Sequence, residues 1–92
     1  MREKQIETKL KREVKRIGGL ALKFTSPGNA GVPDRIVLLP NGNVVFAELK
    51  APGKNLRPLQ IKRKEQLETL GFKVYIIDSY EKVDAFIQEV MG

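Results

Sequence analysis

The stretch that decides the fold is GVPDRIVLLPNGNVVFAELKAPG, residues 31–53. Two apolar runs lie on either side of a Pro40-Asn41-Gly42 turn, which is typical of the two strands of a hairpin. Charged residues stand at the open end of this hairpin, because Asp34 begins the first run while Glu48 and Lys50 end the second. An unpaired charge held out of water is costly, so these three residues either face solvent or share a task.

The length of the turn determines which residues face each other across the hairpin. A two-residue loop would place Asp34 opposite Leu49, whereas the three-residue loop Pro40-Asn41-Gly42 would place it opposite Glu48. We prefer the three-residue loop, because proline suits the second position of a type I turn and glycine suits the left-handed residue that follows. In that register the Cβ atoms of the two acids lie about 4.5–5.5 Å apart. Lys50 then projects from the same face as Glu48.

Two carboxylates at this separation repel each other unless a proton or a cation lies between them. The chain contains no cysteine and no histidine. This composition excludes thiolate and histidine metal sites, as well as Ser-His-Asp and Cys-His catalysis. Ligands that are all oxygen suit Mg²⁺ or Mn²⁺ rather than zinc. An enzyme of this composition must therefore work with carboxylates, lysine and a hard metal ion.

The rest of the chain alternates between helical and strand patterns. Apolar residues at Ile6, Leu10, Val14 and Ile17 form a helical stripe that Gly18 and Gly19 end. We expect this helix over residues 2–17, strands over 20–24, 34–39 and 43–50, a helix over 58–70, a strand over 72–78, and a closing helix capped by Asp78 or Ser79.

These elements predict an α/β fold with the order αβββαβα and a mixed sheet flanked by helices. Residues 36–39 and 44–47 are apolar on both alternations, so we expect the hairpin to be covered on both faces. The 92 residues suffice for one domain, residues 1–92, and 41% of them are hydrophobic. A core of this size is small, and oligomerisation would add to it.

The charge of the chain indicates an anionic partner. Lys and Arg number 17 against 11 Asp and Glu, a net charge of +6, and the sequence pI is about 9.8. Nucleic acid is the commonest partner of such a chain, and an anionic membrane surface is the second. No run approaches the roughly 18 apolar residues of a membrane span. The absence of cysteine fits a cytoplasmic protein.

The charged residues of the hairpin also resemble a known signature. Asp34, 13 intervening residues and then Glu48-Leu49-Lys50 resemble the PD-(D/E)xK nuclease motif, with Pro33 as its proline. More narrowly, GVPDRIVLL, VFAELKAPG, LRPLQ and GFKVYIIDSYEKVDAFI resemble the VRR-Nuc family, the virus-type replication-repair nucleases. The resemblance extends from Glu7 to the last helix. It implies a restriction-endonuclease-like core and cleavage of DNA that depends on a divalent metal ion.

The resemblance also assigns roles by position. Asp34 and Glu48 resemble metal ligands, with the backbone carbonyl of Leu49 completing the protein's share, and the ion is expected to be Mg²⁺ or Mn²⁺. Lys50 resembles the catalytic lysine, which would stabilise the hydroxide or the transition state.

Two further residues are assigned less directly. Glu7 is similar to the acid on the family's first helix and would hold a metal-bound water or a second ion; a solvated helix charge is the alternative. Glu3 and Glu13 have weaker claims to that position. Gln60 is similar to a glutamine of the second helix, with a capping or surface role as the alternative. Residues at predicted loop ends are expected to contact the DNA backbone: Lys23, Ser26, Lys54 and Arg57.

We therefore predict a structure-selective endonuclease, most specifically a homodimer that resolves four-way (Holliday) junctions in DNA repair. One chain carries one site, whereas symmetric resolution needs two cuts, which a C2 dimer supplies. Helix 1 and the loop over residues 25–33 are the expected interface. A flap or non-specific DNA nickase and a non-catalytic DNA-binding module are the alternatives. The resemblance implies a bacterial or phage-encoded intracellular protein.

Overall fold

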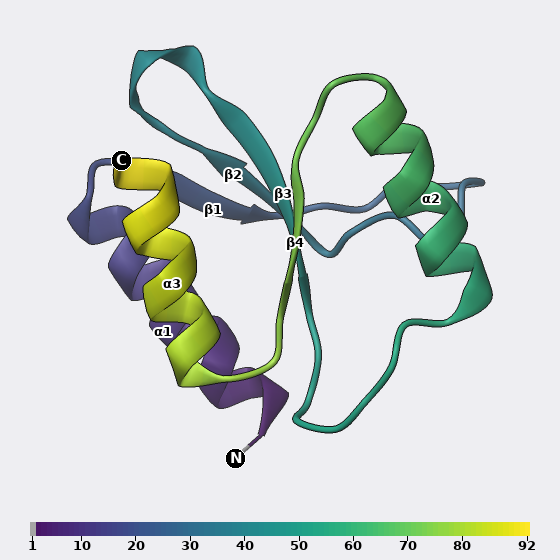
Figure 1. The fold of residues 1–92 in the computed structure, drawn as a ribbon, viewed down its shortest axis with the longest axis horizontal. Helices are drawn as coiled ribbons and strands as arrows, with labels where there is room; N and C mark the ends of the chain where they lie inside the picture. The colour runs from purple at the N-terminus through teal and green to yellow at the C-terminus, as the bar shows by residue number, and fades with distance from the viewer. Residues whose placement is uncertain (1) are drawn as a thin grey trace.

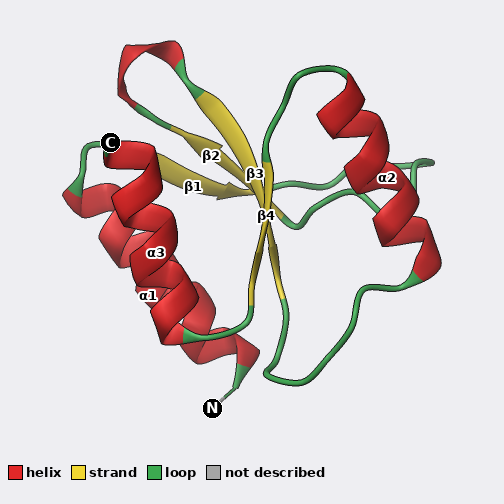
Figure 2. Cartoon of the chain, viewed as in Figure 1, coloured by secondary structure: helices red, strands yellow, loops and turns green. Residues whose placement is uncertain are grey.

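The computed structural model describes residues 2–92, and its elements follow the predicted order. They are drawn in Figure 1 and coloured by type in Figure 2. The elements are α1 (Glu3–Arg16), β1 (Leu20–Lys23), β2 (Arg35–Leu38), the short 3-10 turn η1 (Pro40–Gly42), β3 (Val44–Leu49), α2 (Pro58–Thr69), β4 (Val74–Ile77) and α3 (Tyr80–Met91).

The four strands form one mixed sheet in the order β1-β2-β3-β4. Strands β1, β2 and β3 pair antiparallel, and β4 pairs parallel to β3. A parallel neighbour requires a crossover connection, which the chain makes through α2. Figure 1 shows α1 and α3 on one side of the sheet and α2 on the other. The predicted fold class is thus confirmed.

The core lies between the sheet and the α1/α3 pair. The apolar stripe of α1 supplies Ile6, Leu10 and Val14, all 0% exposed. Burying a side chain of this size contributes roughly 1.5–3 kcal/mol, so these positions hold α1 in place. Helix α3 is capped by Ser79, one of its two predicted N-cap residues, whose hydroxyl accepts a 3.1 Å hydrogen bond from the Lys82 N–H.

The hairpin adopts the register of a three-residue loop. Ile36 pairs with Phe46, and the Leu39 N–H donates a 2.8 Å hydrogen bond to the Asn43 carbonyl. The turn differs in one detail from the prediction, because Asn41 (φ 67°) as well as Gly42 (φ 76°) is left-handed. Asparagine tolerates this region better than most residues, since its short side chain can hydrogen-bond locally. The register sets Asp34 beside Glu48.

The second face of the sheet is covered less completely than predicted. Leu22 of β1, Ile36 of β2 and Phe46 of β3 lie in one row on this face. Leu22 is 45% exposed, and Ile36 is half-buried. Helix α2 is one helix that packs near β4, so it leaves the β1 side open. We call the apolar residues on this face the apolar band and define it as the exposed Leu20, Leu22 and Phe72, the half-buried Ile36 and the buried Phe46.

The loop between β1 and β2 is held against α2. A Cβ atom on Gly31 (φ +87°) would lie 2.5 Å from the carbonyl oxygen of Leu59, so only glycine fits this close approach. The Arg63 guanidinium also donates a 3.1 Å hydrogen bond from Nη2 to the Ala30 carbonyl. These contacts bring the start of β2 close to α2.

Candidate active site

At the open end of the hairpin, the side chains of Asp34 and Glu48 each accept a hydrogen bond from the backbone on the opposite side. The Asp34 N–H donates a 3.1 Å hydrogen bond to Oε1 of Glu48. In the opposite direction, the Leu49 N–H donates a 3.2 Å hydrogen bond to Oδ1 of Asp34. Each carboxylate is thus oriented by the backbone beside the other, which places two acids in one small volume.

This arrangement disfavours the charged form of both acids. Burial and the neighbouring Asp34 carboxylate raise the pKa of Glu48 to about 7, although Lys50 opposes the rise. Burial also raises the pKa of Asp34, against the hydrogen bond from Leu49. The Lys50 ammonium lies 3.7 Å from Oε2 of Glu48. A single lysine therefore leaves the pair with more negative charge than its surroundings stabilise.

Gln60 joins the start of α2 to this pair. Its Nε2 donates a 2.8 Å hydrogen bond to Oε2 of Glu48. Its Oε1 accepts a 2.8 Å hydrogen bond from the N–H of Arg57, the N-cap residue of α2. Gln60 is 9% exposed. The helix cap, which the sequence leaves as one alternative, is present, and the same side chain contacts Glu48.

These residues line a cavity of about 580 Å³ where β3 ends, which residues from the starts of α1 and α2 also line. Asp34, Glu48, Lys50 and Gln60 line it together with the cationic residues Lys54 and Arg57. Leu49 also lines the cavity. Because the Leu49 side chain belongs to the core, its backbone is the part that faces the site.

The predicted DNA contacts fall in different places. Lys54 and Arg57 border the cavity of the two carboxylates. Lys23 instead lines a second depression of about 400 Å³, which meets the first one at Asp34. Ser26 lies in the loop after β1, outside both depressions.

Glu7, the acid predicted on helix 1, is bound to a basic residue. Its Oε2 lies 2.6 Å from Nη2 of Arg35, whose side chain is 8% exposed. The hydrogen bond from Arg35 lowers the pKa of Glu7. Arg35 also donates a 3.4 Å hydrogen bond from Nη1 to the Ala21 carbonyl. The ion pair therefore joins α1 to strands β1 and β2.

Glu3 is the acid of α1 that lines the cavity of the two carboxylates, one helical turn before Glu7. Its charge contributes to the raised pKa of both Asp34 and Glu48. The sequence does contain a signal that Glu7 has a partner of its own, although helical periodicity does not reveal it. Arg35 follows Asp34 into a buried strand, and a buried guanidinium requires a carboxylate partner, which Glu7 supplies.

The donor set fits a hard divalent ion. Within residues 2–92, no group of three or more Asp, Glu, His or Cys side chains is arranged to hold a metal ion. Mg²⁺, however, commonly binds through one or two carboxylates plus water and substrate phosphate oxygens rather than in a cage made by the protein alone. Two close carboxylates with raised pKa values match this requirement.

In the part of the chain that the structure describes, no helix is both long enough and apolar enough to cross a bilayer.

Comparisons with known proteins identify close relatives. A scan against protein-family models finds no match. The protein named "Putative nuclease p44" from Acyrthosiphon pisum secondary endosymbiont phage 1 is 49% identical over 81 residues, which cover 88% of this chain and 87% of that protein. A solved structure described as a VRR_NUC domain superposes with a TM-score of 0.88 at 30% identity, over 94% of each chain.

Proposed function

Because this chain belongs to the VRR-Nuc nuclease family, we propose that it is a Mg²⁺-dependent endonuclease that hydrolyses DNA phosphodiesters in the Asp34–Glu48 cavity. Mn²⁺ is expected to substitute for Mg²⁺. The observation that carries the proposal is the close pair of carboxylates beside Lys50, of which Glu48 is buried and Asp34 half-buried. Two such acids repel each other in the free protein, and a bound cation relieves the repulsion.

Asp34, Glu48 and the backbone carbonyl of Leu49 are the groups that would hold the ion. Bound there, Mg²⁺ offsets the negative charge of the scissile phosphate and makes water more acidic. The protein's contribution is to hold both carboxylates in place, through the Asp34 N–H on Glu48 and the Leu49 N–H on Asp34. Gln60 holds the second oxygen of Glu48.

In the hydrolysis, a water oxygen forms a bond to phosphorus while the bond from phosphorus to one sugar oxygen breaks. The leaving sugar oxygen takes up one proton, and the second proton of the water passes to solvent. Negative charge grows on the phosphate oxygens during this step. The Lys50 ammonium, 15% exposed, is positioned to stabilise that charge in a partly dry site. Lys54 and Arg57 bind the flanking phosphates.

We further propose that the working unit is a homodimer that resolves four-way junctions. One chain carries one site, and two cuts related by symmetry need two sites at a fixed separation, which a C2 dimer provides. The apolar band supports this proposal, because Leu20 (56% exposed), Leu22 (45%) and Phe72 (40%) present apolar surface to solvent. We place the second copy on this band rather than on helix 1, whose exposed positions are mainly charged or polar.

Two measurements test these proposals separately. Nicking of supercoiled plasmid with Mg²⁺ is expected, with no nicking in EDTA and much slower nicking by Lys50→Ala; equal nicking in EDTA would contradict metal dependence. For the dimer, light scattering should give twice the chain mass, and Leu22→Glu should give the monomer mass. Mapping cuts on a junction with each strand labelled in turn should show positions related by two-fold symmetry. If the wild-type protein were a monomer, the dimer proposal would be wrong, and a structure-selective nickase would be the remaining function.

A further inference from the structure

Helix α1 carries six basic residues, and they divide into two groups by their partners. One group is paired with carboxylates: Lys9 with Asp84 at 2.9 Å, and Arg12 and Arg16 with Glu13 at 3.6 and 3.1 Å. The other group is Lys4, Lys11 and Lys15. In the described residues, no carboxylate oxygen lies within 4.0 Å of these three ammonium groups.

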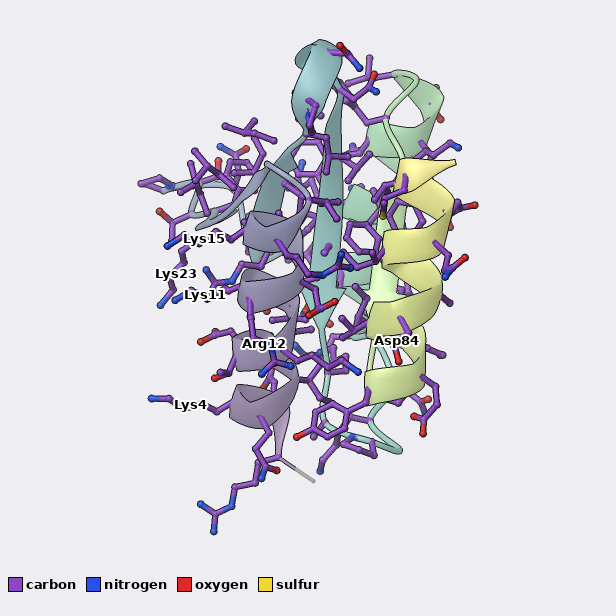
Figure 3. All side chains as sticks on the ribbon, turned by 90° about the vertical axis from the view of Figure 1, so that its left-hand side faces the viewer. Lys4, Lys11, Arg12, Lys15, Lys23 and Asp84 are labelled. Atoms are coloured by element: carbon purple, nitrogen blue, oxygen red, sulfur yellow. The ribbon has the colours of Figure 1, made fainter. Side chains whose placement is uncertain are left out.

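The unpaired lysines form a straight line along the helix. At about 100° per residue, positions 4, 11 and 15 fall within about 40° of one another. At 1.5 Å per residue the line is about 16 Å long. Figure 3 shows Lys4, Lys11 and Lys15 extending from one side of α1 with Lys23 beside them, whereas Asp84 lies across on α3. We call Lys4, Lys11, Lys15 and Lys23 the lysine stripe; all four are exposed.

The lysine stripe is continuous with the candidate active site. Lys4 and Lys23 line the second depression, whose wall includes Asp34. Glu7 lies on the same helix between Lys4 and Lys11 and would otherwise weaken the positive potential there. Its carboxylate is bound to Arg35 at 2.6 Å, so Arg35 neutralises much of its charge. Glu3 lines the same depression and offsets part of the charge of Lys4 and Lys23. The stripe therefore begins at the carboxylates and leads away from them along α1.

We propose that the lysine stripe binds the phosphate backbone of a duplex arm that leaves the cleavage site along α1. This inference rests on the proposed function. Each strand of a duplex presents one charge per 3.4 Å of axis, so a stripe of about 16 Å faces about five phosphates of one strand. Flexible, exposed lysines suit such contact, which depends on charge and not on sequence.

A membrane surface is the other anionic partner that lysines could meet, and the structure favours DNA. A helix that binds membranes inserts an apolar face beside its basic residues. The apolar face of α1 is already used, because Ile6, Leu10 and Val14 are fully buried in the core.

The test compares two variants that lose the same charge. Lys11→Gln/Lys15→Gln removes two stripe lysines that line neither depression. Lys62→Gln/Lys73→Gln is the control, because both lysines are exposed and also lie outside the two depressions. Binding to four-way junctions with arms of about 5 and about 15 base pairs is measured by fluorescence anisotropy in EDTA over a range of salt. Two lost phosphate contacts should lower the slope of log K against log salt by about 1.8 on the long arms.

The expected result is that this loss occurs for the stripe variant on long arms, is small on short arms and is absent in the control. Equal losses in both variants would show an effect of net charge and would overturn the inference, as would a stripe variant that binds like wild type. Loss of binding to phosphatidylserine vesicles with unchanged DNA binding would overturn it in favour of a membrane. Since binding is measured without metal, absence of cleavage by the wild type in Mg²⁺ would refute only the proposed function.

Discussion

The amide of Gln60 donates a 2.8 Å hydrogen bond to Oε2 of Glu48 while its oxygen accepts one, also of 2.8 Å, from the N–H of Arg57. The first turn of α2 is therefore connected directly to a carboxylate of the site. A change at this one side chain should affect both the stability of the helix and the orientation of Glu48.

Gln60→Ala should lower the free energy of unfolding by about 1–3 kcal/mol, since it removes a cap and leaves the buried Glu48 with one hydrogen bond fewer. It should also lower the single-turnover cleavage rate by about 10–100-fold, the usual effect of losing an outer partner of a metal ligand. Urea unfolding and single-turnover assays measure the two effects.

The two roles of Gln60 can be separated by supplying the cap from another residue. Arg57 is the N-cap residue and has no side-chain cap hydrogen bond, so Arg57→Ser should add one. In the Arg57→Ser background, Gln60→Ala should cost much less stability than it costs in the wild type. It should lower the cleavage rate, relative to Arg57→Ser alone, as much as it does in the wild type. Recovery of the rate would show that Gln60 acts only through the helix.

The two carboxylates should have opposite effects on activity and on stability. Asp34→Asn or Glu48→Gln should abolish detectable cleavage, because each removes a charge that would hold the ion. In EDTA at neutral pH the same variants should unfold at higher urea concentration than wild type, since the repulsion between the acids is gone. Normal Mg²⁺-dependent cleavage by either variant would contradict the site assignment.

The pH dependence of stability follows from the raised pKa of Glu48, about 7 against an ordinary 4.5. Asp34 just before β2, Lys50 just after β3, Glu3 of α1 and Gln60 of α2 surround this group. Between these two pH values the folded protein holds a proton that the unfolded chain has released. Stability in EDTA should therefore fall as pH rises through this window, by on the order of 3 kcal/mol.

Urea unfolding at about pH 5 and about pH 8 measures this loss. Glu7 has a lowered pKa, so its contribution is lost only as pH falls below this window. Glu48→Gln should remove most of the dependence. If the wild type were equally stable at both pH values, the surroundings of Glu48 would be more polar than the structure indicates.

Much of the fold and part of the site follow from local sequence. The apolar periodicity gives the order of elements, and the Pro40–Gly42 turn gives the register that pairs Ile36 with Phe46. That register alone brings Asp34 to Glu48. The open side of the sheet does not follow, because alternation along a strand shows which residues share a face but not how far one helix extends across it.

The contacts of the acids on α1 do not follow from the sequence, for a related reason. Periodicity shows which residues share a face of the helix, but only the docking of α1 on the sheet shows that Arg35 binds Glu7 and that Glu3 lines the cavity of the two carboxylates. The sequence likewise does not divide the basic residues of α1 into groups. Only the ion pairs of the folded protein show that Lys9, Arg12 and Arg16 have carboxylate partners.

Lys50 is expected to act in chemistry, and Lys54 and Arg57 in binding. Lys50→Ala should lose most turnover and keep its DNA affinity close to that of wild type, since many other cations contact the phosphates. Lys54→Ala and Arg57→Ala should bind more weakly, with the slope of log K against log salt reduced by about 0.9 each. A Lys50→Ala variant that keeps its single-turnover rate and loses affinity would reverse the assignment.

Substitutions of the two acids of α1 should have different effects, one on stability and the other on activity. Glu7→Gln removes the ion pair with the buried Arg35 guanidinium and should lower the free energy of unfolding by about 1.5–3 kcal/mol, because the guanidinium loses a charged hydrogen-bond partner. Glu3→Gln removes an exposed carboxylate at the cavity and should change stability by at most about 0.5 kcal/mol.

Because Glu3 adds negative charge beside Asp34 and Glu48, Glu3→Gln should raise the Mg²⁺ concentration needed for half-maximal cleavage. Titrating Mg²⁺ against rate in both variants, at a temperature where both are folded, decides between them. A higher Mg²⁺ requirement in Glu7→Gln but not in Glu3→Gln would return the role to Glu7, as the sequence first predicts.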